Sequence, residues 1–267
     1  MLGVRGCAPE GGEVSVVVAA WGGGVNSTAM ICEWLARGNE LHLALFADTG
    51  GEKPETYRYR DYFAAWLKDR GVPFNSVVGA GKYGSLEEEC LGSKTLPSLA
   101  YGFKKCSLKW KRRPQDVFVN NWEPARASWA KGEKVVKLIG FDAGEQRRAK
   151  FPEDEKYTWR YPLIEYGLDR DGCVQSIKDH GLAVPPKSSC FFCPASKKNE
   201  IINLAQDHPD LMKRALQIEK SAEETNQFVV GLGRSFRWAD VVSNDKAQGK
   251  LWNAEPEMPC DCTDGDE

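Results

Sequence analysis

The stretch that most constrains the fold of this 267-residue chain is residues 14–28, where an apolar run ends abruptly in three consecutive glycines. The run, Val16–Trp21, has the length and composition of a buried β-strand. Beyond Gly22–Gly24 the apolar residues return at helical spacing, and Gly38 marks the end of the helix. We therefore expect a strand, a tight glycine turn and a helix N-terminus, whose free N–H groups and positive dipole end favour an anion, most often a phosphate.

Three polar residues follow the glycines, and each can cap the helix or bond a phosphate oxygen: Asn26, Ser27 and Thr28. The loop is not a Walker sequence, because no Gly-Lys-Ser/Thr follows the glycines. It is not G-x-G-x-x-G either, because Ser27 stands where the last glycine belongs. An ordinary tight turn of an α/β protein is the alternative interpretation.

The pattern after the first helix predicts more strands of the same sheet. Leu41–Ala47 and Pro73–Val78 read as strands separated by an aromatic-rich helix, and Val135–Gly140 reads as a fourth strand. This alternation predicts a doubly wound α/β fold, with a mostly parallel sheet and helices on both faces. Ligands of such sheets bind beyond the carboxyl ends of the strands, so Gly22–Ser27 and Asp48–Thr56 should face one crevice.

Both loops carry a family resemblance. The glycine loop resembles the pyrophosphatase loop (PP-loop) S-G-G-x-D-S of the adenine nucleotide alpha-hydrolase superfamily, with Gly22 and Asn26 in place of its serine and aspartate. Asp48–Gly50, followed by Pro-Glu-Thr, resembles the D-T-G-x-x-x-P-E-T signature of the phosphoadenosine phosphosulfate (PAPS) reductase-like family. Arg148 stands where the relatives place an arginine that grips sulfate or phosphate, with Arg147 as a second candidate.

The resemblance implies a Rossmann-like (HUP/PP-loop) fold that binds ATP, or a related adenine nucleotide, with Mg²⁺. It implies catalytic roles for Asn26, Ser27 and Arg148. The residues expected to contact the nucleotide lie in three loops: Gly22, Gly23, Gly24, Asn26, Ser27, Thr28, Asp48, Thr49, Gly50, Arg147 and Arg148. Loop N–H groups and arginine would stabilise charge on the phosphates while an acceptor attacks the α-phosphate and pyrophosphate leaves.

Nine cysteines in a chain without a signal-peptide pattern suggest metal or redox chemistry before disulfides. The C-x-x-C of Cys190 and Cys193 brings two thiolates to one ion or cluster, and Cys90 and Cys106 are the expected partners. Sulfate-assimilating members of the family, and tRNA- and DNA-thiolating relatives, hold a four-iron [4Fe-4S] cluster with a similar late C-x-x-C. Zinc held by four thiolates is the rival. Buried inert cysteine is a third interpretation, and the one that we expect for Cys32.

The most basic stretch, Lys104–Arg113, lies in a chain whose formal net charge is -2. It would attract the phosphate of a nucleotide or of a nucleic-acid acceptor. Trp110 within it could stack a base, or pack beneath a solvated cationic surface. Near the C-terminus, Gly231–Ser235 is a second glycine-rich turn that could close over a phosphate.

We expect four parts along the chain. A flexible leader (1–13) precedes a PP-loop nucleotide-binding α/β domain (14–180). A helical part with the C-x-x-C follows (181–242), and the chain ends in an acidic flexible tail (243–267). No apolar run approaches the ~20 residues of a membrane span, so we expect a cytoplasmic protein without membrane contact.

Three functions fit these patterns. The first, which we favour, is a PP-loop enzyme that adenylates an acceptor with ATP for sulfur transfer or nucleic-acid modification, with a sulfur-donor protein as a further partner. The second is a PAPS (sulfonucleotide) reductase, which needs a nucleophilic cysteine. Cys260 and Cys262 lie among acidic residues, which raise a thiol pKa and oppose that role. The third is a non-catalytic nucleotide- or nucleic-acid-binding module stabilised by a four-cysteine metal site.

Overall fold

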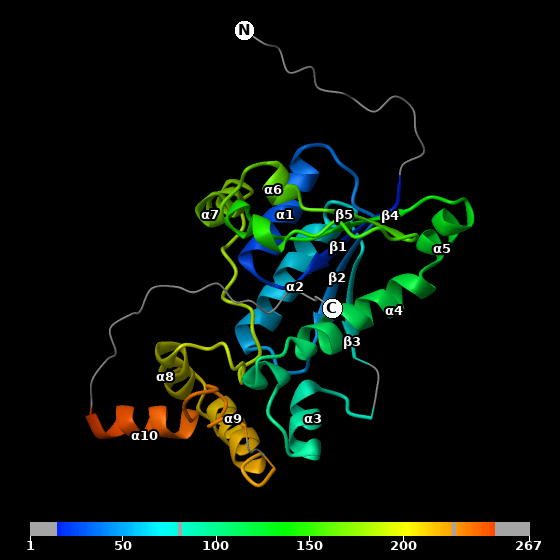
Figure 1. Cartoon of the computed structure of the whole chain (residues 1–267). Helices are drawn as coiled ribbons and strands as arrows, with labels where there is room; N and C mark the ends of the chain where they lie inside the picture. Colours follow the sequence, from blue (N-terminus) through cyan, green and yellow to red (C-terminus); the bar gives the residue numbers. More distant parts are fainter. Residues whose placement is uncertain (1–14, 80–81, 226–227, 249–267) are drawn as a thin grey trace.

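The computed structural model describes residues 15–79, 82–225 and 228–248. Its sheet contains β1 (Val17–Trp21), β2 (Leu43–Asp48), β3 (Phe74–Val78), β4 (Val135–Leu138) and β5 (Tyr157–Arg160). All neighbouring pairs are parallel, in the order β3-β2-β1-β4-β5. The expected doubly wound α/β fold is confirmed (Figure 1).

Helices connect the strands and continue beyond the last of them. They are α1 (Val25–Ala36), α2 (Pro54–Lys68), α3 (Leu86–Ser93), α4 (Arg113–Asn121), α5 (Glu123–Ala130), α6 (Pro162–Glu165), α7 (Arg170–Asp179), α8 (Lys198–Asp207), α9 (Pro209–Ser221) and α10 (Trp238–Gln248). The connections hold two 3₁₀ helices, η1 (Ser98–Tyr101) and η3 (Ala143–Arg148), and a π-helical segment, η2 (Ser107–Arg112).

Different helices cover the two faces of the sheet, because successive residues of a strand point to opposite sides. Ala19 and Trp21 of β1 share a core with residues of α1, α2 and α7, whereas Val18 shares a core with residues of α4 and α5. Figure 1 shows these two groups of helices on either side of the sheet. Since both faces are buried at the centre of the sheet, β1 and β2 read as near-continuous apolar runs, whereas the edge strands β3 and β5 are more exposed.

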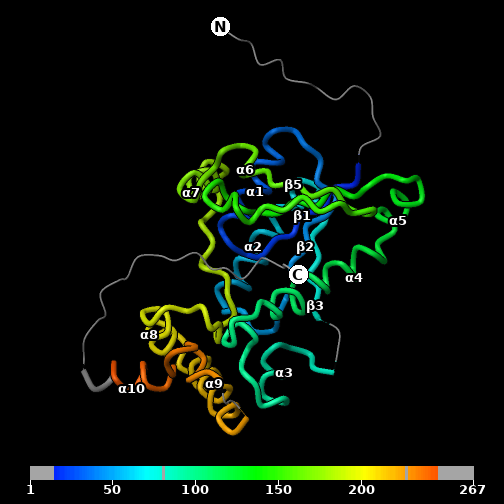
Figure 2. Tube along the Cα trace, viewed as in Figure 1, coloured from blue at the N-terminus to red at the C-terminus, as the bar shows by residue number. Residues whose placement is uncertain are grey.

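A third hydrophobic core lies where α8, α9 and α10 pack together. Figure 2 shows these helices and α3 away from the sheet. Leu86 of α3 and Trp110 belong to this core, although both fall inside the predicted 14–180 domain. The connection between β3 and α4 is long enough to leave the sheet, and Glu87 of α3 then forms an ion pair with Arg214 of α9.

The helical part also extends further along the chain than predicted, because α10 continues to Gln248 and therefore includes residues 243–248 of the predicted tail. The rest of that tail and the predicted leader lie outside the described residues, as do Cys7, Cys260 and Cys262. Within the described ranges, no helix has both the length and the apolar character needed to span a membrane.

Candidate functional site

The glycine loop lies at the point where the strand order of the sheet reverses. Chain connections lead from β1 to β2 on one side, while β4 pairs with β1 on the other. The loops that follow β1 and β4 meet here, and a Cβ added at Gly140 would lie 2.8 Å from the Ser27 Cα. Such a switch point is where open α/β sheets bind their ligands.

The glycine turn is shaped by its own backbone and by Ser27. Gly23 has a φ of +76°, which a residue with a side chain rarely adopts. The Ser27 hydroxyl donates to the Gly24 carbonyl (3.2 Å) and accepts from the Gly22 N–H (3.1 Å). Space beside Gly22 is open, with no atom within 4 Å of an added Cβ. The loop is thus a preformed turn at a helix N-terminus with an open side.

Thr28 differs from the expectation that its hydroxyl contacts a phosphate. Its side chain is buried in the core beneath α1. The hydroxyl accepts from the Trp21 indole N–H (3.0 Å) and donates to the Gly24 carbonyl (2.9 Å). Because both bonds lie inside the fold, Thr28 supports the turn from the core side, and its hydroxyl is not available to a phosphate.

Asn26 is the centre of a polar network. Its amide donates to the Asp142 carboxylate (2.9 Å) and to the Glu145 carboxylate (3.1 Å), while its carbonyl oxygen accepts from Arg170 (2.8 Å). An aspartate here would place a third carboxylate against two others. The network therefore gives a physical reason for asparagine at the position where the PP-loop pattern has aspartate.

Asp142 and Arg170 were not among the predicted site residues. The signal for Asp142 was present in the sequence as D-x-x-E, because Asp142 and Glu145 form a capping box at the start of η3. Nothing in the local sequence around Arg170 indicates a contact with the glycine loop, since the two are far apart along the chain.

The two predicted phosphate-binding arginines separate in the structure. Arg148 forms an ion pair with Glu145 and lies over the Phe141 ring, 4.4 Å from its centre. Arg147 is exposed to solvent. Arg148 therefore belongs to the Asn26 network, whereas Arg147 has no such contact with the residues that the structure describes.

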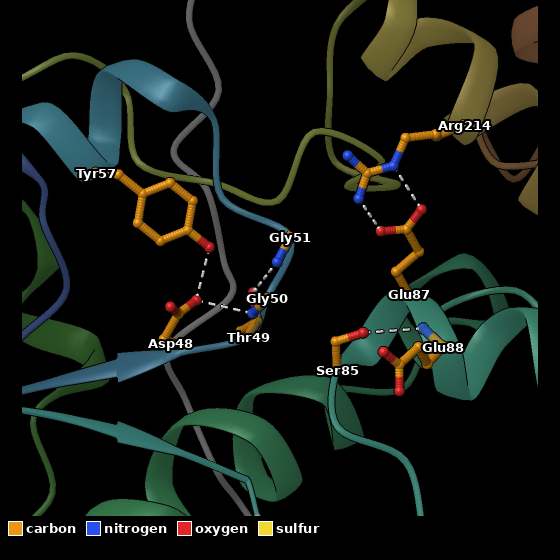
Figure 3. Close-up of polar contacts among 9 residues, drawn as sticks. All are labelled: Asp48, Thr49, Gly50, Gly51, Tyr57, Ser85, Glu87, Glu88 and Arg214. Atoms are coloured by element: carbon orange, nitrogen blue, oxygen red, sulfur yellow. Dashed lines mark hydrogen bonds and ion pairs between the residues drawn. The ribbon is translucent and has the colours of Figure 1, made fainter.

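The second loop, which follows β2, makes an Asx turn (Figure 3). The Asp48 carboxylate accepts from the Gly50 N–H and from the Tyr57 hydroxyl, both at 2.8 Å. Thr49 is buried, and its hydroxyl lies 3.1 Å from the Cys190 sulfur. Gly50 approaches the start of α3 closely, since a Cβ there would lie 2.5 Å from the Ser85 Cβ. The loop thus packs against the C-x-x-C segment.

A pocket next to this loop, which we call the thiol pocket, is lined by Cys106, Cys190 and Cys193. Its other walls include Thr49, Lys104, Lys111 and Ser188. Cys90 belongs to the same apolar cluster but does not line the pocket. The Cys106 sulfur is 2.8 Å from the Ser98 hydroxyl. The structure thus gathers the four predicted ligands in one region and places three of them on one cavity.

The thiols of this region are in an apolar setting. Burial raises the pKa of Cys190 to about 12, and burial raises the pKa of Cys90 as well. Thiol donors in an apolar cluster are of the kind that binds zinc or an iron–sulfur cluster. Within the described ranges, however, no three His, Cys, Asp or Glu side chains are arranged to hold a metal ion. Metal binding would therefore require the thiols to lose their protons and to move together.

Cys32 is also buried, in the core beneath α1, and burial raises the pKa of its thiol to about 12. This agrees with the expectation of an inert cysteine.

The basic stretch is partly neutralised by ion pairs. Lys109 pairs with Glu89, and the Lys111 ammonium lies 3.7 Å from the buried Glu52 carboxylate. Arg112 lies 3.5 Å from Asp116. Burial raises the pKa of Glu52. The cationic field of this stretch is therefore weaker than its sequence suggests.

Trp110 corrects one prediction made for this stretch. Its side chain is 2% exposed, and its indole N–H donates to Glu89 (2.6 Å). A buried ring cannot stack a base, so the alternative expectation, packing beneath the cationic surface, is the observed one.

The C-terminal glycine turn is corrected as well. The buried Glu219 carboxylate accepts from the backbone N–H groups of Leu232 (2.8 Å), Trp238 (2.9 Å) and Ala239 (3.0 Å). A Cβ at Gly231 would lie 2.5 Å from a Glu219 oxygen. The turn is therefore packed on α9, and its N–H groups serve a carboxylate of the same chain instead of a bound phosphate.

No protein-family model and no curated protein matches the sequence. Among solved structures, the chain is similar to the U34-tRNA thiolase NcsA from Methanococcus maripaludis, described with its [4Fe-4S] cluster. The similarity covers 90% of this chain and 83% of that chain, at 16% identity and a TM-score of 0.37. A TM-score this low transfers no activity to this chain.

Proposed function

We propose that this chain is an ATP-using, PP-loop-like enzyme that adenylates an acceptor for sulfur transfer or nucleic-acid modification. The acceptor oxygen attacks the α-phosphorus, a new oxygen–phosphorus bond forms, and the bond to pyrophosphate breaks. The observation that carries the proposal is the adjacency of two sites. The glycine loop at the switch point and the thiol pocket share Ser188, and Thr49 of the second loop bonds Cys190.

The roles proposed for the glycine-loop side follow from the geometry. N–H groups at the start of α1 would bind the phosphates, and Arg148 would add positive charge beside them. Asn26 would hold the loops after β1 and β4 in register, and Ser27 would keep the turn in shape. Since Asn26 offers no carboxylate, Asp142 and Glu145 are the nearest acidic ligands for the Mg²⁺ that accompanies ATP.

The thiol pocket is proposed as the metal-binding half of the site. Cys106, Cys190 and Cys193, with Cys90 moving toward them, would hold a [4Fe-4S] cluster or, as the alternative, zinc. An iron–sulfur cluster would supply a sulfur-binding or electron-carrying centre next to the activated acceptor.

A nucleic-acid acceptor is proposed because Lys104 lines the thiol pocket and Lys105 is exposed beside it. These two side chains would contact backbone phosphates near the reacting group. A sulfur-donor protein would complete the reaction.

The reductase alternative has less support. A reductase presents a thiolate to its bound substrate, but its candidate nucleophiles, Cys260 and Cys262, lie among acidic residues, which raise a thiol pKa. A non-catalytic binding module would use the same loop and pocket without pyrophosphate release.

A pair of glycine variants tests the nucleotide site. Gly23 and Gly38 share a φ of +76°, so alanine strains the backbone at either position. A Cβ at Gly23 would also approach Thr56 Cγ2 to 3.2 Å, whereas Gly38 has open space. We expect Gly23→Ala to lower ATP affinity by about tenfold or more in calorimetry, and the matched Gly38→Ala to leave it unchanged.

The reaction itself is tested with protein isolated without oxygen and incubated with ATP and separate tRNA, DNA and small-molecule fractions. Pyrophosphate release that depends on one fraction supports adenylation. ATP binding without release in any fraction would favour the binding module, and equal affinity in the two glycine variants would contradict the proposed loop.

A further inference from the structure

Ser188 lies against the glycine loop although it is distant from it in sequence. A Cβ added at Gly24 would be 2.9 Å from the Ser188 Oγ, and one added at Gly23 would be 3.6 Å from the Ser188 Cβ. Ser188 also lines the thiol pocket. One side chain therefore borders both halves of the proposed site.

The segment that carries Ser188 is fixed at both ends. Before it, the Tyr59 hydroxyl donates to the Ala183 carbonyl (2.7 Å), and the Lys187 ammonium binds Glu200 (2.7 Å). After it, the Phe191 N–H donates to the Gly51 carbonyl (2.8 Å). These contacts tie the segment to α2, α8 and the second loop, so that the approach of Ser188 to Gly24 is a built feature of the fold.

The hydroxyl groups near the glycine loop differ in their availability. Ser27 bonds within the turn, and Thr28 is buried in the core. Position 22, where the PP-loop pattern has a serine, is a glycine with open space beside it. Among the residues that the structure describes, the Ser188 hydroxyl is engaged in no hydrogen bond.

We propose that Ser188 is a phosphate-binding residue, whose hydroxyl donates to the phosphate group of the nucleotide held on the glycine loop. Gly22 has no hydroxyl to offer a phosphate, and Ser188, from the C-terminal half of the chain, supplies one in its place. It also brings the phosphates to the edge of the thiol pocket. This inference rests on the proposed ATP site and adds one residue to it.

The first test compares Ser188→Ala with Ser196→Ala, a matched loss of a half-exposed hydroxyl just beyond the C-x-x-C. Calorimetry is done with ATP and with adenosine. We expect Ser188→Ala to weaken ATP binding by about tenfold to a hundredfold, because a bond to a charged phosphate is lost. Adenosine affinity should stay the same, and Ser196→Ala should bind both ligands as the parent chain does.

The second test moves the hydroxyl without removing it. The φ of Gly24 is -106°, so alanine fits the backbone, and its Cβ meets only the end of the Ser188 side chain, which can rotate away. Gly24→Ala should therefore weaken ATP binding in the parent chain and have little further effect in Ser188→Ala. Such non-additivity is the signature of two changes that act through one contact.

The outcomes separate the two proposals. Failure of the parent chain to bind ATP would overturn the proposed function together with this inference. ATP binding that is equal in the parent and Ser188→Ala overturns this inference alone. An equal loss for ATP and adenosine also overturns it, because that result assigns Ser188 a structural role.

Discussion

At the scale of single residues, Asn26 shows how one side chain can join distant segments. It accepts from Arg170 of α7 and donates to carboxylates of η3 and its cap, Glu145 and Asp142. An amide can donate and accept at once, whereas a carboxylate can only accept. The identity of this residue therefore decides whether the loops after β1 and β4 attract or repel each other.

We predict that Asn26→Asp lowers the free energy of unfolding at pH 7 by about 1–3 kcal/mol, because two hydrogen bonds become contacts between carboxylates. Urea unfolding measures the change. The difference should shrink as the pH falls and the carboxylates become protonated. Asn121→Asp is the matched control, since the Asn121 amide donates to the Val117 carbonyl on α4. A loss of similar size in both variants would contradict the argument.

Residue roles were only partly predictable from the sequence. The glycine turn was predictable because a strand, three glycines and a helix leave the chain few alternatives. The direction in which the Thr28 side chain points was not predictable. Residues of the first helical turn point to different sides, and only the contact with Trp21 shows that Thr28 faces the core.

At the scale of elements, the first turn of α2 joins the α/β part to the helical part. His208, which precedes α9, binds the Glu55 carboxylate near the start of α2. Burial alone would raise the pKa of Glu55. Hydrogen bonds from its own backbone and from His208 outweigh burial and hold that pKa below its ordinary value of 4.5. The ionised form is therefore favoured in the folded chain.

The lowered pKa of Glu55 sets the direction in which the stability of the fold changes with pH. A carboxyl group with a lowered pKa contributes stability above its ordinary pKa, and this stability is lost as the pH falls through the folded value. We predict that Glu55→Gln has a lower Tm than the parent chain at pH 7, and that the gap narrows below pH 4.5. Glu123→Gln, in the first turn of α5, controls for the loss of a helix-dipole contact. A gap that is constant with pH would rule out a contribution from the ionised Glu55 carboxylate.

The strands β1 to β4 were predicted, because buried parallel strands leave strong apolar signals, whereas the edge strand β5 was not predicted. The glycine turn at 231–235 was not, since the pattern that suggests a phosphate loop also suits a backbone that wraps a buried carboxylate. Only the position of Glu219 on α9 distinguishes the two.

At the scale of the whole molecule, two hydrophobic cores meet at the candidate site. The α/β core ends at the glycine loop, and the helical core contains Cys90, Cys190 and Cys193. The C-x-x-C motif was visible in the sequence as a metal signal. Its upstream partners could not be ranked from the sequence. Cys106 lines the pocket because residues 86–110 lie away from the sheet in the folded chain, and only the structure shows this.

Because the four cysteines lie in the helical core, loss of a bound metal should destabilise that core and leave the α/β core unchanged. If the four thiols hold a cluster or zinc, the ion crosslinks α3, η2 and the C-x-x-C segment, and its binding free energy stabilises the helical core. Removal by a chelator, or by Cys190→Ser, should then increase amide hydrogen exchange in α3, α8 and α9. The strands β1 and β2 should keep their protection, because their contacts lie in the other core.

Cys32→Ser is the control for this experiment, since Cys32 is also buried but lies in the α/β core. It should raise exchange around α1 and leave the metal content of anaerobically isolated protein unchanged. Iron, sulfide and zinc assays on the same samples distinguish a cluster from a single ion. Equal metal content in Cys190→Ser and in the parent chain would contradict the thiol pocket as a metal site, even if exchange in the helical core had changed.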